Sequence, residues 1–185
     1  MSKSNSEQTV ITPKFRASFV KVFRAEAFEE GKEPRYGIMM LFPEGTDLTR
    51  MKMAIRAAVK NKWGDKPPKS LELPLKRGDD SDREEQQGMI VARASNTAKP
   101  GIVGLDPHIP ITDETEFYSG CWARASVFAY PYDYKGMKKG VTFLLNNIQK
   151  LEDDEAFSGG RSAPEDDFDD EISAKGEPNE FDLDL

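Results

Sequence analysis

The sequence of 185 residues contains a single cysteine, Cys121, and a single histidine, His108. One cysteine excludes an internal disulfide framework, and metal sites normally draw on several histidines and cysteines. The two residues could in principle form a nucleophile pair. Cys121, however, lies in a row of small apolar residues, where a thiol is normally buried and structural. His108 lies between two loop residues, Pro107 and Ile109, and is expected to hold a turn.

Long apolar runs and phosphate-binding glycine motifs are also missing. No run is long enough to cross a bilayer, and the N-terminus, MSKSNSEQTV, has no apolar segment of the signal-peptide type, so a cytoplasmic protein is expected. The motif GxxxxGK[ST] is absent, and Gly101 and Gly104 lack the strand-to-helix setting of a dinucleotide fingerprint. The acidic pairs at 79–80 and 153–154 lie in segments predicted to be mobile, without the rigid frame of a catalytic site. We therefore expect no enzyme activity, no cofactor and no metal.

Charge is distributed unevenly along the chain. The sequence has 33 Asp and Glu against 26 Lys and Arg, a formal net charge of -7. Residues 151–185 hold 14 of these acids and 2 of these bases, which leaves the first 150 residues with 19 acids, 24 bases and a net charge of +5. A basic body joined to an acidic arm is typical of a protein that binds nucleic acid or another polyanion. A solubilising tail on an ordinary domain is the alternative.

The clearest helix is predicted at residues 46–63. Its apolar residues recur with the three-four spacing that places them on one face. Thr46 or Asp47 can cap the N-terminus, and Gly64 can end the helix. The outward face carries four bases, Arg50, Lys52, Arg56 and Lys60. These bases could touch phosphate, but a charged outer helix face is usually only solvated.

The rest of the body reads as strands. They are predicted at residues 12–24, 35–42 and 88–94, at a short segment after residue 100, and in a hairpin within residues 117–151. The alternation of the first strand breaks down around residues 20–23, which indicates a bulge. Several strands with turn signals and one helix favour a mainly β fold. The best match is an OB-fold, a five-stranded Greek-key barrel with one inserted α-helix.

The composition divides the chain into three parts. We predict a disordered N-terminus at residues 1–11, an OB-fold domain at 12–151 and a disordered acidic tail at 152–185. The last residues of the tail, EFDLDL, alternate apolar and acidic side chains. Such an end can dock into a basic, apolar groove on a partner. The residues expected to do so are Phe181, Asp182, Leu183, Asp184 and Leu185.

The predicted hairpin has two different faces, because side chains alternate across a strand. One row is small and apolar and is predicted to be core: Cys121, Ala123, Ala125, Val127 and Ala129. The other row carries aromatic and cationic residues: Trp122, Arg124, Ser126, Phe128 and Tyr130. Aromatic platforms beside cations are what a protein needs to hold the unstacked bases of a single strand. The alternative is a two-sided sandwich in which these aromatics are buried against a second layer.

Longer motifs accompany these features. They are LPLKRGDD, G-x-x-V-x-A-x-S-N, KPGIVGLD and, above all, YSGCWARASVFAY followed by KGVTFLLNNIQKLEDDEAFSGGRSAPEDDF. Over residues 12–168 the sequence resembles the bacteriophage single-stranded DNA-binding protein family. The resemblance implies an OB-fold that binds single-stranded DNA without strong sequence preference, during phage replication and recombination in the host cytoplasm. It also implies an acidic tail that contacts other replication proteins, although Leu185 replaces the terminal aromatic residue of many relatives.

The resemblance ranks the candidate DNA contacts. The leading candidates are Trp122, Arg124, Phe128, Tyr130, Tyr132, Tyr134, Lys135, Lys138 and Lys139. Further candidates on other strands and turns are Lys14, Arg16, Arg24, Arg35, Tyr36, Arg93 and Lys99. Cations would contact phosphates and aromatic rings would stack on bases. The alternative is a solvated surface charge for each base, and core packing for Tyr36 and Phe128.

The acidic tail is expected to compete for the DNA groove and to be freed for phage or host replication proteins when DNA binds. Two other functions stay open. One is an adaptor of the replication machinery that touches DNA only incidentally, and the other is an RNA-binding OB-fold protein. The edge strands of an open barrel also favour a homodimer.

Overall fold

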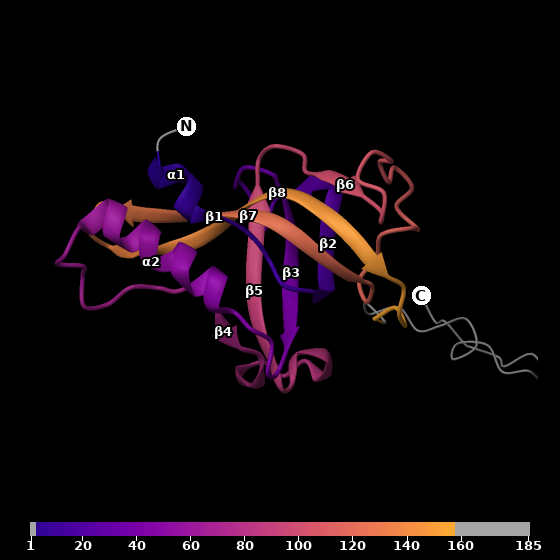
Figure 1. Ribbon diagram of the computed structural model, residues 1–185, viewed down its shortest axis with the longest axis horizontal. Helices are drawn as coiled ribbons and strands as arrows, with labels where there is room; N and C mark the ends of the chain where they lie inside the picture. Colours follow the sequence, from indigo (N-terminus) through magenta and orange to yellow (C-terminus); the bar gives the residue numbers. More distant parts are fainter. Residues whose placement is uncertain (1–2, 158–185) are drawn as a thin grey trace, which may run out of the picture.

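The computed structural model describes residues 3–157, with side chains from Asn5 onward (Figure 1). The helices in this range are α1 (Lys3–Gln8) and α2 (Thr49–Trp63), with two short 3-10 helices at Gly78–Asp80 and Glu84–Gln86. The strands are β1 (Thr9–Ile11), β2 (Phe15–Glu26), β3 (Arg35–Pro43), β4 (Lys76–Arg77), β5 (Met89–Asn96), β6 (Gly101–Val103), β7 (Trp122–Tyr134) and β8 (Lys138–Glu152). None of the helices in residues 3–157 is both long and apolar enough to cross a membrane. The predicted docking residues at 181–185 lie outside the described residues.

Five of the strands pair in a closed circuit. β2 pairs with β3, β3 with β5, β5 with β8, β8 with β7, and β7 again with β2. A closed circuit of five strands is the arrangement of an OB-fold barrel. The predicted mainly β, OB-like fold is therefore confirmed. The remaining three strands extend this circuit: β1 pairs with β7, β4 with β5, and β6 with β8.

The bulge expected in the first barrel strand is present. The register of β2 against β3 shifts between Ser18 and Lys21 and again between Lys21 and Glu26. Phe19, at the first shift, has a positive φ of 46°, an unusual conformation for a large side chain. Such a bulge bends a strand and increases its twist, which helps a short sheet to close into a barrel.

The two faces of β7 are as predicted. The small row, which begins one residue before β7, is buried throughout: Cys121, Ala123, Ala125, Val127 and Ala129. Small side chains fit there because Phe15, Phe42 and Phe143, all fully buried, fill the narrow interior. In the outward row, Arg124 and Tyr130 are exposed, and Trp122, Ser126 and Phe128 are half-buried. The hairpin therefore presents its aromatic row on the outer surface of the barrel.

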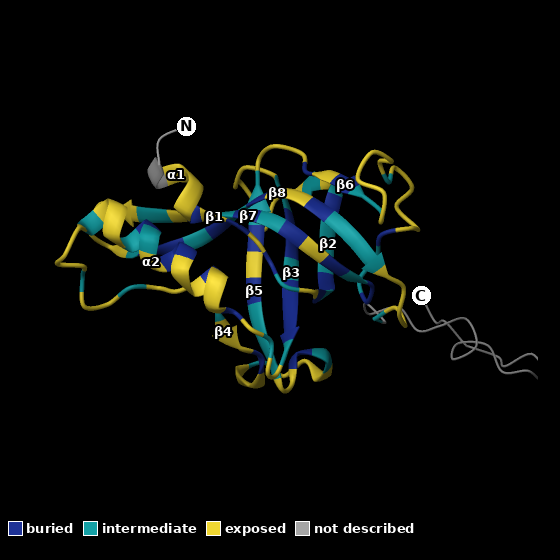
Figure 2. Cartoon of the chain, viewed as in Figure 1, coloured by how far each residue is buried: buried dark blue, intermediate teal, exposed yellow. Residues whose placement is uncertain are grey.

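Helix α2 buries one face against the barrel and exposes the other, as Figure 2 shows. The buried face of the helix consists of Met51, Ala54, Ile55 and Ala58. The predicted caps at Thr46 or Asp47 are wrong: the N-cap is Leu48, which makes no side-chain cap. The Asp47 carboxylate instead accepts a hydrogen bond from the Thr49 N–H at 3.0 Å. Asp47 precedes the N-cap by one residue and is therefore not the cap itself.

The C-terminal end of α2 is as predicted. Gly64 has a positive φ of 65°, which glycine adopts readily, and its N–H donates to the Lys60 carbonyl at 2.8 Å.

The prediction of a disordered N-terminus is wrong for residues 3–11. This segment forms α1 and β1, and β1 lies antiparallel to β7 with Thr9 opposite Phe128. Val10 is buried in the core, and the Gln8 side chain donates to the Ala129 carbonyl at 2.9 Å. The order comes from contacts with distant residues, which the polar composition of the segment does not indicate.

The predicted boundary between domain and tail also falls too early. β8 continues to Glu152, and residues 153–157 lie against the start of β7. The Phe157 N–H donates to the Ser119 carbonyl at 2.9 Å. The first acidic residues of the tail are therefore part of the packed body.

Candidate nucleic-acid interface

Outward residues of three neighbouring strands meet on one surface of the barrel. In the register, Tyr130 of β7 lies opposite Thr142 of β8, and Leu144 of β8 lies beside Ser95 of β5. Together they border a cavity of about 650 Å³. Its lining includes Arg35, Ser95, Tyr130, Tyr132, Tyr134 and Lys138. We call this cavity the aromatic groove.

The aromatic groove continues onto β3 and β5. An adjoining cavity of about 300 Å³ shares Glu72, Tyr132 and Thr142 with it. The adjoining cavity adds Met39 of β3 and Arg93 of β5 to the lining. β3 and β5 are the second and third strands of the barrel, and the hairpin joins the fourth and fifth. In OB-folds this face and this hairpin form the surface that binds oligonucleotides.

The three tyrosines of the groove differ in their freedom to meet a ligand. Tyr130 and Tyr134 are 46% and 66% exposed. Tyr132 is half-buried, and its hydroxyl donates a hydrogen bond to Glu72 Oε2 at 2.9 Å. The rings of Tyr132 and Tyr134 lie 5.2 Å apart between centroids, tilted by 35°. Tyr132 therefore supports its neighbour, while Tyr130 and Tyr134 offer open ring surface.

Glu72 also holds the start of β8, next to the hairpin tip, through its backbone. Its N–H donates to the Lys139 carbonyl at 2.9 Å, and its carbonyl accepts from the Val141 N–H at 2.9 Å. Gly140 is required between these two residues, because a Cβ there would overlap the Glu72 backbone oxygen. Burial first, and the hydrogen bond to Glu72 second, raise the pKa of Tyr132 to about 12. The Tyr132 hydroxyl therefore stays protonated at neutral pH.

A further aromatic residue lies next to the groove. The ring of Phe28, in the loop between β2 and β3, lies 3.8 Å from the Arg93 guanidinium and 5.7 Å from Lys21 Nζ. The Phe28 ring lies beside Gly37, where an added Cβ would meet both Phe28 and Ser95 at an ordinary contact distance of 3.5 Å. Sequence reasoning missed Phe28. The available signal was an aromatic residue in a loop that is otherwise polar.

A second aromatic and cationic cluster lies at the start of β7. Lys14 Nζ lies 4.9 Å from the centre of the Trp122 ring, and the Arg16 guanidinium lies 6.0 Å from it. Both cations are paired with acids at or just after the end of β8: Lys14 with Glu152 at 2.6 Å, and Arg16 with Asp154 at 3.5 Å. We call Lys14, Arg16 and Trp122 the Trp122 cluster.

Residues 152–157 cover the Trp122 cluster, and we call them the acidic strap. Trp122 Nε1 donates to Asp154 Oδ2 at 2.7 Å, and this hydrogen bond is the main cause of the lowered pKa of Asp154. Arg16 donates to the Glu155 carbonyl at 2.8 Å, and its guanidinium lies 4.4 Å from the Phe157 ring. The hydrogen-bonding capacity of the Trp122 cluster is thus used by the chain itself.

The structure therefore separates residues that the sequence placed together. Tyr130, Tyr132, Tyr134, Lys138 and Arg35 line the aromatic groove, with Arg93 in the adjoining cavity. Trp122 lies eight residues before Tyr130 on the same strand, or about 26 Å at the usual strand rise. Arg124 lies between the two sites and donates to the Gln149 side chain at 2.8 Å.

The other candidates are scattered. Arg24 pairs with Glu114 at 3.1 Å, and Lys139 lies 3.8 Å from Asp133. Lys99 is exposed in the turn between β5 and β6, and Lys135 is exposed at the hairpin tip with a φ of 49°. Tyr36 and Phe128 are half-buried in the sheet. A DNA-contacting role for all of these residues stays a prediction.

The lone cysteine is packed in the core, as expected. Cys121 is fully buried, and burial is the main cause of its raised thiol pKa. Across residues 3–157, no three or more His, Cys, Asp or Glu side chains group closely enough to hold a metal ion.

The barrel and the aromatic groove define an OB-fold protein with an aromatic, cationic surface. A comparison of sequences identifies its family. The chain belongs to the family of the single-stranded DNA-binding protein of Enterobacter phage Enc34, whose profile matches residues 8–180. The resemblance inferred from the motifs is therefore confirmed. A curated relative, putative protein p50 of Acyrthosiphon pisum secondary endosymbiont phage 1, is 28% identical over 173 residues. This match covers 88% of the present chain and 93% of the relative.

Solved structures share the fold. The single-stranded DNA-binding protein of bacteriophage Enc34 in complex with single-stranded DNA superposes with a TM-score of 0.71 at 24% identity, covering 85% of this chain and 96% of that one. The single-stranded DNA-binding protein gp2.5 of bacteriophage T7 gives a TM-score of 0.56 at 12% identity, with 84% and 98% coverage. At these identities the likeness establishes a common architecture.

Proposed function

We propose that the protein binds single-stranded DNA along the aromatic groove, largely without sequence preference. The observation that carries this proposal is the grouping of two exposed rings, Tyr130 and Tyr134, with Arg35 and Lys138 in one cavity. Rings of this kind stack on any base, and cations beside them contact the phosphates. The one acid in the lining, Glu72, is engaged by the Tyr132 hydroxyl. The Enc34 relative, whose structure was solved in complex with single-stranded DNA, is consistent with this use of the fold.

The protein acts by binding rather than by catalysis. Rings and cations on a rigid barrel hold the DNA extended and cover its bases, which would protect a single strand during phage replication and recombination. The groove contacts the flat faces of the bases and the phosphate charges, which all four nucleotides share. It therefore distinguishes unstacked from stacked bases better than one base from another.

The acidic strap acts as a competitor for DNA at the Trp122 cluster. It supplies carboxylates to Lys14 and Arg16 and an acceptor to Trp122, the same kinds of contact that a phosphate would make. DNA that reached this cluster would have to displace the strap. Displacement would free residues 152–185 to recruit phage or host replication proteins.

A titration with matched oligonucleotides tests the main proposal. Single-stranded DNA, the corresponding duplex and RNA of the same sequence are each added to the full-length protein, and binding is followed by tryptophan fluorescence and gel shift. We expect single-stranded DNA to bind most tightly, with an affinity that falls as salt is raised. Equal affinity for single and double strands would refute the proposal, and tighter binding of RNA would assign the groove to RNA.

Two remaining expectations concern protein contacts. Recruitment by the tail is tested by capture of replication proteins from infected cells on the full-length protein, with and without saturating single-stranded DNA. Capture should increase when DNA is bound. A homodimer through the barrel edges, at β1 and β6, would appear as a concentration-dependent mass in sedimentation.

A further inference from the structure

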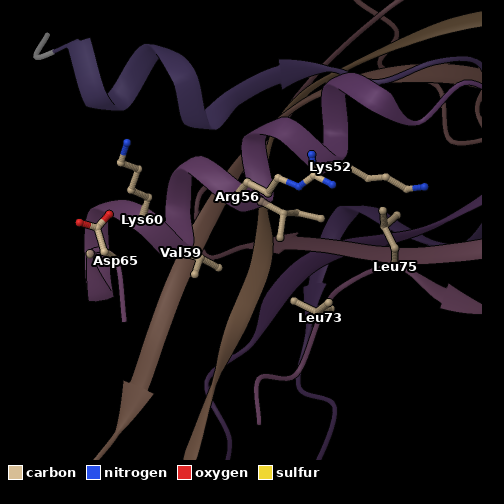
Figure 3. Close-up of a pocket in the computed structure, with 9 residues that line it drawn as sticks. Lys52, Arg56, Val59, Lys60, Asp65, Leu73 and Leu75 are labelled. Carbon is tan, nitrogen blue, oxygen red and sulfur yellow. The ribbon is translucent and has the colours of Figure 1, made fainter. Parts of the chain in front are cut away.

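A second groove, on the far side of residues 71–75 from the aromatic groove, is left unexplained by DNA binding. This cavity of about 610 Å³ lies between α2 and the segment that leads into β4, and we call it the α2 groove. Its floor is apolar, formed by Ile55, Val59, Leu73 and Leu75. Figure 3 shows Val59 on α2 and Leu73 on the facing segment bordering the cavity from two sides. Leu73 is 48% exposed, which is a large exposure for a leucine with an apolar neighbourhood.

The rim of the α2 groove is basic. Lys52, Arg56 and Lys60 follow one another along α2 on this side (Figure 3). The helix sequence, TRMKMAIRAAVKNKW, contains no Asp or Glu. Among the described residues, none of these three cations has an ion-pair partner within 4.0 Å, although Asp65 also lines the cavity. An apolar floor with an unneutralised cationic rim fits a ligand that is apolar on one side and acidic on the other.

We propose that the α2 groove binds the C-terminal residues 180–185, EFDLDL, of a second copy of this chain. In an extended conformation alternate side chains point to opposite sides. Phe181, Leu183 and Leu185 would then face the apolar floor. The acids of the segment would face the basic rim, and the terminal carboxylate would add one more negative charge.

The spacing of the charges supports this match. Cations four residues apart on a helix are separated by about 6 Å along its axis. Acids two residues apart in an extended chain are separated by about 6.7 Å. The three acids Glu180, Asp182 and Asp184 can therefore run beside the three rim cations of α2 with little loss of register.

The lining of the groove favours a peptide over a nucleic acid. None of the residues that line it is aromatic, so it offers bases no stacking platform. Its volume falls in the range of about 300–1,000 Å³ that is typical of pockets for compact ligands. An apolar side chain such as Phe181 gains from burial there, whereas a phosphodiester backbone would leave the floor unfilled.

The geometry of the chain points to a second copy as the source of the segment. β8 has 15 residues, so it carries the chain about 46 Å along its length. Figure 1 shows α2 toward one end of the long axis and the end of β8 toward the other. A flexible linker of the length of residues 158–180 has a root-mean-square span of only about 27 Å. A linker shorter than the span gives a low effective concentration at the chain's own groove, so a neighbouring copy near the end of β8 is favoured.

Such a contact is head-to-tail, because the tip of one copy meets a different surface of the next. Contacts of this kind do not close on themselves unless the rotation makes a ring, and they continue along a row of copies. The proposal rests on the α2 groove and the C-terminal tip, and its test needs no DNA.

The first part of the test measures the groove. A fluorescent peptide of residues 176–185 is titrated with full-length protein, and binding is followed by anisotropy. The receptor carries alanine at the three apolar tip positions, so that its own tips do not compete: Phe181→Ala, Leu183→Ala and Leu185→Ala. Adding Arg56→Glu should weaken peptide binding at least tenfold, while Lys62→Glu should change it less than twofold. Lys62 is the matched control, because it is exposed on the same helix and does not line the groove.

The second part of the test separates a second copy from the chain's own tail. Full-length Arg56→Glu protein, with an intact tip and a damaged groove, is mixed with the tip variant, with an intact groove and a damaged tip. We expect the mixture to form a one-to-one complex in sedimentation at concentrations where each variant alone is monomeric.

Three results would overturn the proposal. They are peptide binding that is unaffected by Arg56→Glu, a mixture that forms no complex, and a variant that weakens single-stranded DNA binding while peptide binding is unchanged. The last result would make the α2 groove part of the DNA path. Thermal melting checks that the variants are folded, and Lys52→Glu supplies a second rim variant with the same expected loss.

Discussion

Removing the open rings of the aromatic groove should weaken DNA binding by an amount that can be stated in advance. Tyr130 and Tyr134 are 46% and 66% exposed, so truncating either one to alanine leaves no cavity in the core. Base–aromatic stacking is worth about 1–3 kcal/mol per ring by substitution. Each single variant should therefore raise the Kd for single-stranded DNA about 5- to 150-fold. The double variant should lose about the sum, provided that the two rings hold different bases.

The assay is a fluorescence titration with an oligonucleotide at several salt concentrations. The slope of log affinity against log salt should be unchanged, since no cation is removed, whereas Lys138→Ala should reduce it by about 0.7 for a single strand. Tyr134→Phe is the matched control and should bind nearly as the unchanged protein does, because the ring is retained. Alanine variants that bind as tightly as the unchanged protein would refute the role given to these rings.

Three other predictions concern the supports of the groove and its competitor. The raised pKa of Tyr132, about 12, means that its hydrogen bond to Glu72 should stabilise the fold below about pH 10 and that this contribution should be lost as the pH rises toward about 12. Glu72→Gln should lower the pKa of Tyr132 in a phenolate absorbance titration. Gly140→Ala should lower the thermal melting temperature, at a cost of about 1–3 kcal/mol, because its Cβ would overlap the Glu72 backbone. Asp154→Asn should tighten DNA binding at low salt, because it removes a charge that competes for Arg16, and an unchanged Kd would argue against competition by the strap.

Local patterns were enough to predict the hairpin and the barrel. The alternation from Cys121 to Tyr130 has the period of a strand. Its small apolar row was predicted to be the buried one, and it packs in the barrel interior beside large phenylalanine rings. The same alternation predicts which face a residue lies on, but it does not predict where along β7 a ligand binds. It grouped Trp122 with Tyr130, although the strand separates them by about 26 Å.

The remaining features depend on contacts between residues that are distant in sequence. Asp154 bonds to Trp122 from 32 residues away, and Glu72 bonds to Tyr132 from 60 residues away. Composition pointed to disorder at the strap, because composition reports average burial and says nothing of a specific partner. The short strand β1 was missed for the same reason, since its order comes from pairing with β7.

Photo-crosslinking tests most directly whether single-stranded DNA lies in the aromatic groove. An oligonucleotide carrying bromodeoxyuridine is bound to the full-length protein, irradiated and digested, and the attached peptides are identified by mass spectrometry. We predict crosslinks at Tyr130, Tyr134 and Phe28, the rings that lie in or beside this groove. Crosslinks confined to α2 or to the far end of the barrel, with none at these three rings, would contradict the account.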